Sequence, residues 1–272
     1  MSECDLTTEF SCSKNSKNPD TCGVECDTKV EKVYQDLKNS SIERQEDLPY
    51  DSNGKMTQID IWGPENAEKV FIMIHGGYWL IGNRKKCLGV AHAANKLGYT
   101  VVSVGYDYAN KDHVLSKTIS EALEGVQFAL TKFKDAKKFV IGGHSVGAHL
   151  AFQAVTRISD PRISGAFLSA GIYKLQELVY TSYGKDLGLT PEEAEACSCD
   201  YQLLKGIRFP VLITNCKVES PKLYEQNVEF SKIVTTAQYK EYGNEDHFTM
   251  LTELTNEDSP IYIDFYNFLN SI

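Results

Sequence analysis

GHSVG, at residues 143–147, follows the apolar run FVI at residues 139–141 and precedes a segment with helical periodicity. A strand, a tight turn and a helix in this order predict a sharp turn that holds Ser145 in a strained backbone conformation. Side chains two positions to either side would collide in such a turn, and Gly143 and Gly147 remove them. We therefore expect the Ser145 hydroxyl above the end of a sheet, at the N-terminus of a helix, where a substrate can reach it.

The composition is that of a globular protein. The chain has 272 residues, of which 42% are apolar and 24% are charged, and this suits one large α/β domain with a substantial core. A net charge of −9 argues against nucleic acid and anionic membranes as partners. The longest apolar runs have the length of strands, and the N-terminus lacks a basic start followed by an apolar stretch. A cytoplasmic location is the resulting expectation.

Strand-like and helix-like segments alternate along most of the chain. This alternation predicts a mostly parallel central sheet with helices on both faces. The TQIDIW stretch at residues 57–62 alternates with period two and predicts a half-buried edge strand. We expect residues 29–272 to form a single domain with a small helical lid at about residues 173–206. Residues 1–28 are polar and poor in aliphatic side chains, which favours a disordered N-terminal arm.

Eight cysteines are present, and four of them lie in the first 26 residues. Their spacing does not match a zinc motif and no histidine lies near the early four, so no metal site is expected. Disulfides are also not expected in a chain without a secretion signal. The cysteines are interpreted as free thiols.

A serine hydroxyl needs a base within hydrogen-bond distance before it becomes a good nucleophile. His247 is the best candidate, because it follows the last predicted strand, after the serine in the chain. His144 adjoins the serine and is expected to point away from it. His75 begins a glycine loop, and it is expected to hold that loop by hydrogen bonds and not to act as the base. The remaining histidines lie in helical or connecting segments, where packing or surface roles are expected: His92, His113 and His149.

The base in turn needs a carboxylate that orients it. Glu219 follows the strand that ends near Cys216, which is where the acid belongs in the order serine, acid, histidine. Asp246 is adjacent to His247 in the chain, and a neighbour along a loop seldom reaches the ring with good geometry. Glu225 is expected within the next helix. Glu219 is therefore preferred over both.

Attack on a carbonyl carbon creates an oxyanion, which needs N–H donors already in place. The backbone N–H of Val146 is one candidate donor, at the start of the helix after the serine. The others are expected in the HGGYW loop that follows the apolar run at residues 70–74, with Gly77 and Tyr78 as the donors. The full loop consists of His75, Gly76, Gly77, Tyr78 and Trp79.

Together these segments resemble one family, kynurenine formamidase (arylformamidase), of the α/β-hydrolase superfamily. The resemblance runs from about Leu48 to the C-terminus. It includes HGGYW at 75–79, GGHSVGAHL at 142–150, SAGIY at 169–173, LGLT at 187–190, Ser220, Pro221, Gln226 and DHF at 246–248.

The resemblance implies an α/β-hydrolase fold and hydrolysis of N-formyl-L-kynurenine to L-kynurenine and formate, through a formyl-serine intermediate, in tryptophan catabolism. It implies the catalytic residues Ser145, Glu219 and His247 and requires no metal or organic cofactor. Tyr78 and Trp79 either stack on the aryl ring of the substrate or pack between loop and core. Two positions depart from the family pattern, since Glu219 and Lys174 stand where the family tends to have aspartate.

Two alternatives remain open at this point. The first is a broad aryl carboxylesterase of the same fold. The second is an inactive hydrolase-fold protein that serves as a binding module, in which a catalytic or oxyanion residue would be lost. The sequence also leaves the oligomeric state open, with a homodimer as one alternative.

Overall fold

The computed structural model describes residues 3–233 and 237–272, and within these residues the strands form one eight-stranded sheet. The order of the strands across the sheet is β1-β2-β4-β3-β5-β6-β7-β8. The strands span β1 Arg44–Pro49, β2 Gln58–Trp62, β3 Lys69–Ile74, β4 Tyr99–Val104, β5 Lys138–His144, β6 Ile163–Ser169, β7 Val211–Val218 and β8 Ala237–Asp246. Neighbours from β4 to β8 pair in parallel, and β2 pairs antiparallel with both β1 and β4.

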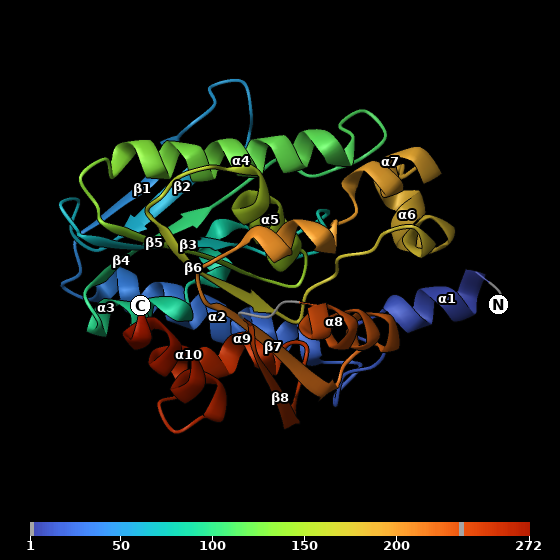
Figure 1. Ribbon diagram of the computed structural model, residues 1–272. Helices are drawn as coiled ribbons and strands as arrows, with labels where there is room; N and C mark the ends of the chain where they lie inside the picture. The colour runs from blue at the N-terminus through green and yellow to red at the C-terminus, as the bar shows by residue number, and fades with distance from the viewer. Residues whose placement is uncertain (1–2, 234–236) are drawn as a thin grey trace.

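Helices cover both faces of this sheet, as the alternation of segments predicts (Figure 1). The α-helices are α1 Glu3–Phe10, α2 Cys22–Asn39, α3 Val90–Lys96, α4 Leu115–Lys132, α5 Val146–Arg157, α6 Ser182–Leu187, α7 Pro191–Cys197, α8 Pro221–Ile233, α9 Thr249–Thr252 and α10 Pro260–Ser271. The 3₁₀ helices are η1 Arg84–Cys87, η2 Glu177–Tyr180, η3 Tyr201–Gly206 and η4 Glu253–Thr255.

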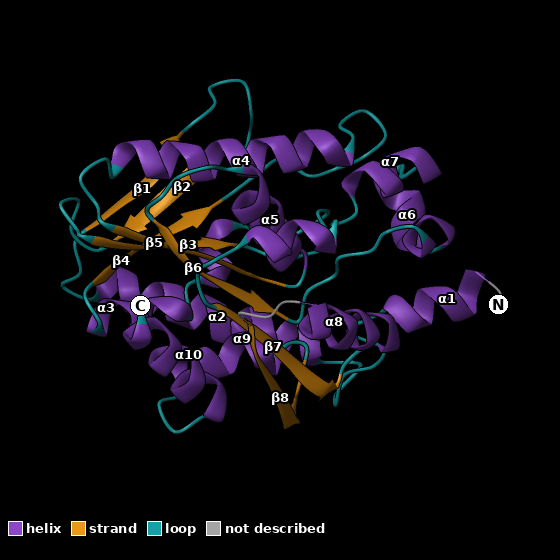
Figure 2. Cartoon of the chain, viewed as in Figure 1, coloured by secondary structure: helices purple, strands orange, loops and turns teal. Residues whose placement is uncertain are grey.

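A separate apolar core lies on each face of the sheet. One core joins the sheet to α4, α5 and α8, and the other joins it to α2, α3 and α10. Figure 2 shows the strands as a layer between these two groups of helices. Strand β3 is buried on both faces, because each of its sides meets one of the cores. The continuous apolar run at residues 70–74 follows from this position.

The edge of the sheet differs from the expectation. We predicted a half-buried edge strand at residues 57–62, but β2 is almost fully buried and lies inside the sheet. The edge strand on this side of the sheet is β1, which pairs along the outer side of β2. Its sequence, RQEDLP, has neither a regular apolar alternation nor a cluster of β-branched residues, so its pattern did not predict a strand.

The N-terminal region also differs from the expectation of a disordered arm. Glu3–Phe10 forms α1, and α2 begins at Cys22, inside the region predicted to be disordered. The Phe10 side chain is fully buried in the core that contains α5 and α8. A few apolar residues in this region are therefore buried by packing against distant parts of the chain. The composition of the region alone does not indicate this packing.

The segment predicted to form a lid, residues 173–206, contains η2, α6, α7 and η3. Thr190 caps α7 by accepting a hydrogen bond from the backbone N–H of Glu193, and Pro191 occupies the first helical position. Figure 1 shows α6 and α7 beyond the end of α5, on the side of the molecule that also holds α1. Within the described residues, none of the helices combines the length and apolar character needed to cross a membrane.

The turn between β5 and α5 depends on its two glycines. A Cβ atom on Gly143 would lie 2.1 Å from the backbone of Gly147, and one on Gly147 would lie 2.1 Å from the carbonyl oxygen of Ile74. Both contacts are with backbone atoms, which cannot rotate away as a side chain can. The glycines are thus required by the close approach of β3, β5 and α5.

We predict that Gly147→Ala lowers the free energy of unfolding by about 3 kcal/mol or more, because the new methyl group forces the backbone of β3 and α5 apart. Gly23→Ala is the matched control, since Gly23 lies in α2 with no atom within 4 Å of the added Cβ. The control should be neutral or stabilising by up to about 1 kcal/mol. Urea denaturation measures both. Equal stability of the two variants would contradict this account of the turn.

Candidate active site

Ser145 lies in the turn between β5 and α5, with a backbone φ of 59° and ψ of −127°. Few residues other than glycine adopt a positive φ, and such a conformation costs on the order of 1–3 kcal/mol. The backbone N–H of Ser145 donates a 2.8 Å hydrogen bond to the carbonyl oxygen of Ser169, at the end of β6, and this bond helps to hold the turn. The serine is therefore fixed at the carboxyl ends of the parallel strands.

Glu219 and His247 meet because of the register between β7 and β8. Val218 pairs with Asp246 across these two strands, so the residues that follow them, Glu219 and His247, leave the sheet side by side. The Nδ1 atom of His247 donates a 2.6 Å hydrogen bond to Oε2 of Glu219, and both side chains are buried. A charge-assisted hydrogen bond of this length fixes the orientation of the imidazole and leaves Nε2 for a second partner.

The surroundings of His247 favour its protonated form. Burial by itself lowers the pKa of this imidazole, but the neighbouring Cys12 thiol and Glu219 carboxylate outweigh burial and raise the pKa well above its ordinary value. The same carboxylate would stabilise the imidazolium that forms when the neutral ring takes a proton as a general base.

His144 holds the backbone of His247 in place. Its Nε2 atom donates a 2.9 Å hydrogen bond to the carbonyl oxygen of His247, and the centres of the two rings lie 4.6 Å apart. Burial and the nearby His247 lower the pKa of His144 well below its ordinary value, so this ring stays neutral. The residue next to Ser145 thus ties the loop of His247 to the serine turn, a role that the sequence analysis did not assign to it.

The other carboxylates considered as the acid have different partners. Asp246 accepts hydrogen bonds from the backbone N–H groups of Lys17, Phe248 and Thr249. Glu225 lies on the exposed side of α8. Of the three carboxylates, the structure brings Glu219 to the histidine ring.

The HGGYW loop lies directly against the serine turn. A Cβ atom added to Gly76 would lie 3.2 Å from the Cβ atom of Ser145. Gly77 has a φ of 114°, and a side chain there would meet the carbonyl oxygen of Ile81 at 2.1 Å. The backbone of the loop therefore passes close to the Ser145 side chain, as an oxyanion site requires. Val146 supplies the first N–H of α5 on the other side of the serine.

Three side chains of the same loop pack against neighbouring aromatic rings. His75 stacks on Tyr106 with ring centres 4.1 Å apart and donates from Nδ1 to the carbonyl oxygen of Gly76. Trp79 is fully buried and packs edge-on against His149, which supports the packing role considered for it. Tyr78 stacks on Tyr183 of α6, with ring centres 4.1 Å apart.

Lys174, where the resemblance implies an aspartate, lies at the start of the lid segment and faces η3 of the same segment. Its Nζ atom lies 4.5 Å from the centre of the Tyr201 ring in η3. Its backbone N–H donates to Oε1 of Gln226 on α8, which also accepts from the N–H of Tyr173. The lysine thus belongs to the contact between the lid segment and α8.

Cys12 is a residue of the site that the sequence analysis missed. Donor atoms of Cys12, Glu219 and His247 all lie within 4.8 Å of one another, and the three residues are buried. A thiol, a carboxylate and an imidazole together are able to bind zinc. Here, however, the carboxylate and Nδ1 of the imidazole are hydrogen-bonded to each other. No local pattern indicated Cys12, because Glu219 and His247 lie more than 200 positions away in the chain.

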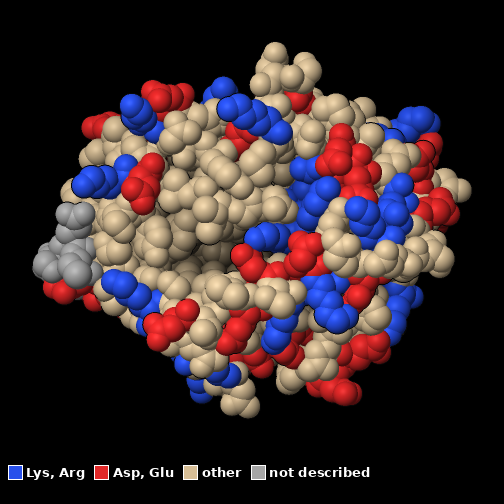
Figure 3. Space-filling view, turned by 180° about the vertical axis from the view of Figure 1, so that it is seen from behind, with Lys and Arg blue, Asp and Glu red and all other residues tan. Residues whose placement is uncertain are grey.

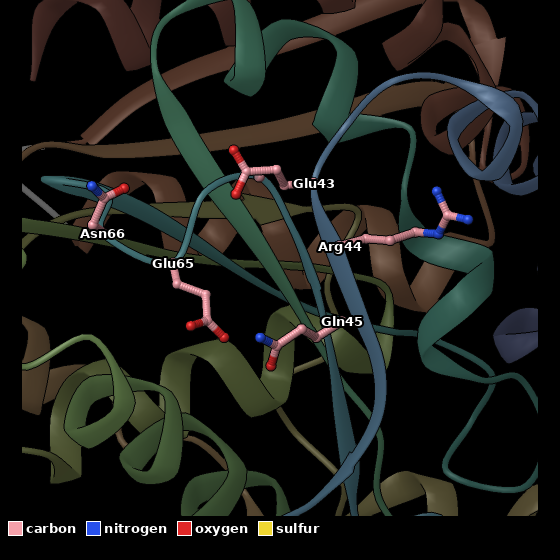
Figure 4. Close-up of a pocket in the computed structure, with 6 residues that line it drawn as sticks. Glu43, Arg44, Gln45, Glu65 and Asn66 are labelled. Carbon is pink, nitrogen blue, oxygen red and sulfur yellow. The ribbon is translucent and has the colours of Figure 1, made fainter.

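A separate polar pocket lies at the opposite end of the sheet. It is lined by residues at the start of β1 and after β2, among them Glu43, Gln45 and Glu65, and Gln45 and Glu65 point toward one another (Figure 4). These residues lie near the amino ends of the parallel strands, whereas Ser145 lies at the carboxyl ends. Figure 3 shows a hollow with mostly uncharged walls on the face of the molecule that is turned away from the viewer in Figure 1.

Comparisons with known proteins agree with this geometry. A family described as having the alpha/beta hydrolase fold matches residues 71–229. The chain is 26% identical over 228 residues to a kynurenine formamidase of Danio rerio, covering 78% of this chain and 77% of that one. It is 22% identical over 227 residues to a kynurenine formamidase of Drosophila melanogaster, covering 75% of each. The resemblance noted in the sequence is thus confirmed.

Solved structures share the fold. A protein from Silicibacter sp. TM1040 described as a putative thioesterase superposes with a TM-score of 0.80 at 18% identity, covering 95% of this chain and 98% of that one. An esterase from Pyrobaculum calidifontis gives a TM-score of 0.72 at 16% identity, covering 92% and 93%.

Buried histidines predict a loss of stability in acid. Burial lowers the pKa of His149 from 6.5 to about 4, although its hydrogen bond to the carbonyl oxygen of Cys197 opposes this shift. Between these two pH values the unfolded chain binds a proton that the folded chain does not, so stability falls as the pH is lowered. The raised pKa of His247 acts in the opposite sense. Its contribution to the free energy of unfolding is fully present below the pKa of the unfolded state and is lost as the pH rises through the pKa of the folded state.

We predict that His149→Gln reduces the loss of unfolding free energy between pH 7 and pH 5 by on the order of 2 kcal/mol. His92→Gln is the control, because His92 lies exposed on α3. Urea denaturation at the two pH values measures the difference. An unchanged pH dependence in His149→Gln would show that this histidine is not held neutral by burial.

Proposed function

Because the chain belongs to the α/β-hydrolase family, which matches it over residues 71–229, we propose that this hydrolase cleaves N-formyl-L-kynurenine to L-kynurenine and formate. The observation that carries the proposal is the Glu219–His247 hydrogen bond, formed beside the strained Ser145 turn. The names of the similar proteins from Danio rerio and Drosophila melanogaster support the choice of a linear aryl formamide as substrate.

In the first half of the reaction, Ser145 Oγ attacks the formyl carbon while His247 takes the hydroxyl proton at Nε2. Glu219 orients the imidazole and stabilises its positive charge. The N–H groups of Val146, Gly77 and Tyr78 receive the negative oxygen, and losing one such donor costs about 2.7–4 kcal/mol of transition-state stabilisation. His247 then passes its proton to the departing arylamine, and a formyl-serine remains.

In the second half, His247 takes a proton from water, and the hydroxide formed attacks the formyl-serine. Formate leaves and the Ser145 hydroxyl is restored. The acyl group carries no carbon beyond the carbonyl, so discrimination between substrates depends on the leaving-group side. The residues of this chain supply nucleophile, base and oxyanion donors, so the proposed reaction requires no cofactor.

We predict that an organophosphate serine probe labels the wild-type protein and fails to label Ser145→Ala. The same variant should lose turnover of N-formyl-L-kynurenine by at least about 10³-fold, since the attacking group is removed. Labelling is followed by mass spectrometry of the intact protein. A wild-type protein that takes no label would favour an inactive hydrolase-fold binding module.

Glu219→Gln should reduce kcat by orders of magnitude while the protein stays folded, because the amide no longer fixes the imidazole in the productive orientation. The equivalent loss is about 10⁴-fold in the serine protease case. Glu225→Gln, on the exposed side of α8, is the matched control. Nearly wild-type turnover in Glu219→Gln would mean that the acid is assigned to the wrong residue.

A comparison of acyl groups separates the formamidase from a broad aryl carboxylesterase. We expect kcat/KM for N-formyl-L-kynurenine to exceed the values for acetyl and butyryl aryl esters. Steady-state assays on the purified protein measure all three. A strong preference for the larger acyl groups would count against the formamidase and in favour of the esterase.

A further inference from the structure

Residues 3–17, called the N-terminal segment below, pack against the elements that surround the proposed active site. Helix α1, the first part of this segment, contacts α6, α8 and η2. Figure 1 shows α1 extending from the end of α8, below α6. Phe10 is fully buried and Cys12 is only 5% exposed. These are the burial values of core residues and not of a loosely attached end of the chain.

Specific hydrogen bonds join this segment to three parts of the site. The Tyr78 hydroxyl, from the HGGYW loop, donates to the carbonyl oxygen of Phe10. The backbone N–H of Ser182, at the start of α6, donates to Oγ1 of Thr7 at 3.0 Å. The N–H of Lys17 donates to Oδ2 of Asp246, directly before His247, at 3.1 Å. The segment is thus fixed on both sides of Cys12.

Cys12 faces the acid and the base together. Its Sγ atom lies within 4.8 Å of a ring nitrogen of His247 and of a carboxylate oxygen of Glu219. Since Nδ1 of His247 is used by Glu219, Nε2 is the nitrogen left for contacts on the other side of the ring. In the proposed reaction, this nitrogen gives its proton to the leaving group.

Burial raises the pKa of the Cys12 thiol, and the nearby His247 opposes this shift. An uncharged thiol behaves as a small apolar group and fills space without demanding a charged partner. The Cys12 side chain thus occupies space next to the imidazole.

We propose that Cys12 is a specificity-determining residue, whose side chain bounds the space beside His247 into which the leaving group of the substrate fits. This inference rests on the proposed function, because it takes His247 as the proton donor to the leaving group. The substrates it concerns have bulky aryl leaving groups, and the residue sets the size of group that is accepted.

Cys22 provides a matched comparison. It is also 5% exposed and lies in the same region of the chain, but it begins α2 and its thiol contacts the carbonyl oxygen of Pro19. A general effect of changing a buried cysteine near the N-terminus should appear at both positions. An effect on leaving-group selection should appear only at Cys12.

The test uses the full chain with Cys12→Ala, Cys12→Leu, Cys22→Ala and Cys22→Leu, each checked for its melting temperature. Acetate esters with a small leaving group (methyl) and a large one (1-naphthyl) keep the acyl group constant. Cys12→Leu should lower kcat/KM for 1-naphthyl acetate about tenfold relative to methyl acetate, mainly through KM. Cys12→Ala, which creates space, should shift the same ratio in favour of 1-naphthyl acetate. The Cys22 variants should keep the wild-type ratio.

Equal changes for both esters in the Cys12 variants, or no change in either, would overturn the proposal. If Cys12→Leu fails to fold, the ratio in Cys12→Ala decides alone. Labelling of Ser145 by the organophosphate probe distinguishes a failure of the role of Cys12 from a failure of the proposed function. A labelled wild-type protein with an unchanged ester ratio in the Cys12 variants contradicts only the role of Cys12, whereas an unlabelled one contradicts the proposed function itself.

Discussion

The strained backbone at Ser145 is the constraint on which the rest of the site depends. A φ of 59° at a residue other than glycine persists only where the surroundings impose it. Here Gly143 and Gly147 let β5, β3 and α5 approach so closely that a methyl group would meet backbone atoms at 2.1 Å. The packing of the central parallel strands therefore compensates the strain and places Ser145 beside the HGGYW loop.

The remaining groups of the site are brought in by the register of the sheet. Pairing of Val218 with Asp246 places Glu219 and His247 next to each other where β7 and β8 end. His144, the last residue of β5, then holds the His247 carbonyl. Residues at the carboxyl ends of β5, β7 and β8 thus meet through the pairing of the strands. The glutamate side chain reaches Nδ1 at 2.6 Å from this loop position, where the resemblance implies an aspartate.

The parts of this arrangement that were predictable have local signals. The GHSVG turn combines an apolar strand, two glycines and a helix start, and each is a property of consecutive residues. The order serine, acid, histidine along the chain predicted Glu219 as the acid, because this residue follows the strand that ends near Cys216. By contrast, β1 has a sequence without strand periodicity, and β2 consequently looked like an edge. Cys12 and His247 are 235 positions apart in the chain, and their contact leaves no periodic pattern in the sequence. Only the polar composition of residues 1–28 remained as a signal, and it favoured a disordered arm.

A crystal structure of the protein with a phosphonate bound to Ser145 Oγ tests the central claim most directly. The account predicts that His247 Nε2 lies within about 3 Å of an oxygen on the adduct's leaving-group side or of Ser145 Oγ. It also predicts that the phosphonyl oxygen accepts hydrogen bonds from the N–H groups of Val146 and of Gly77 or Tyr78. An imidazole of His247 far from the adduct, or a phosphonyl oxygen turned away from these N–H groups, would contradict the account.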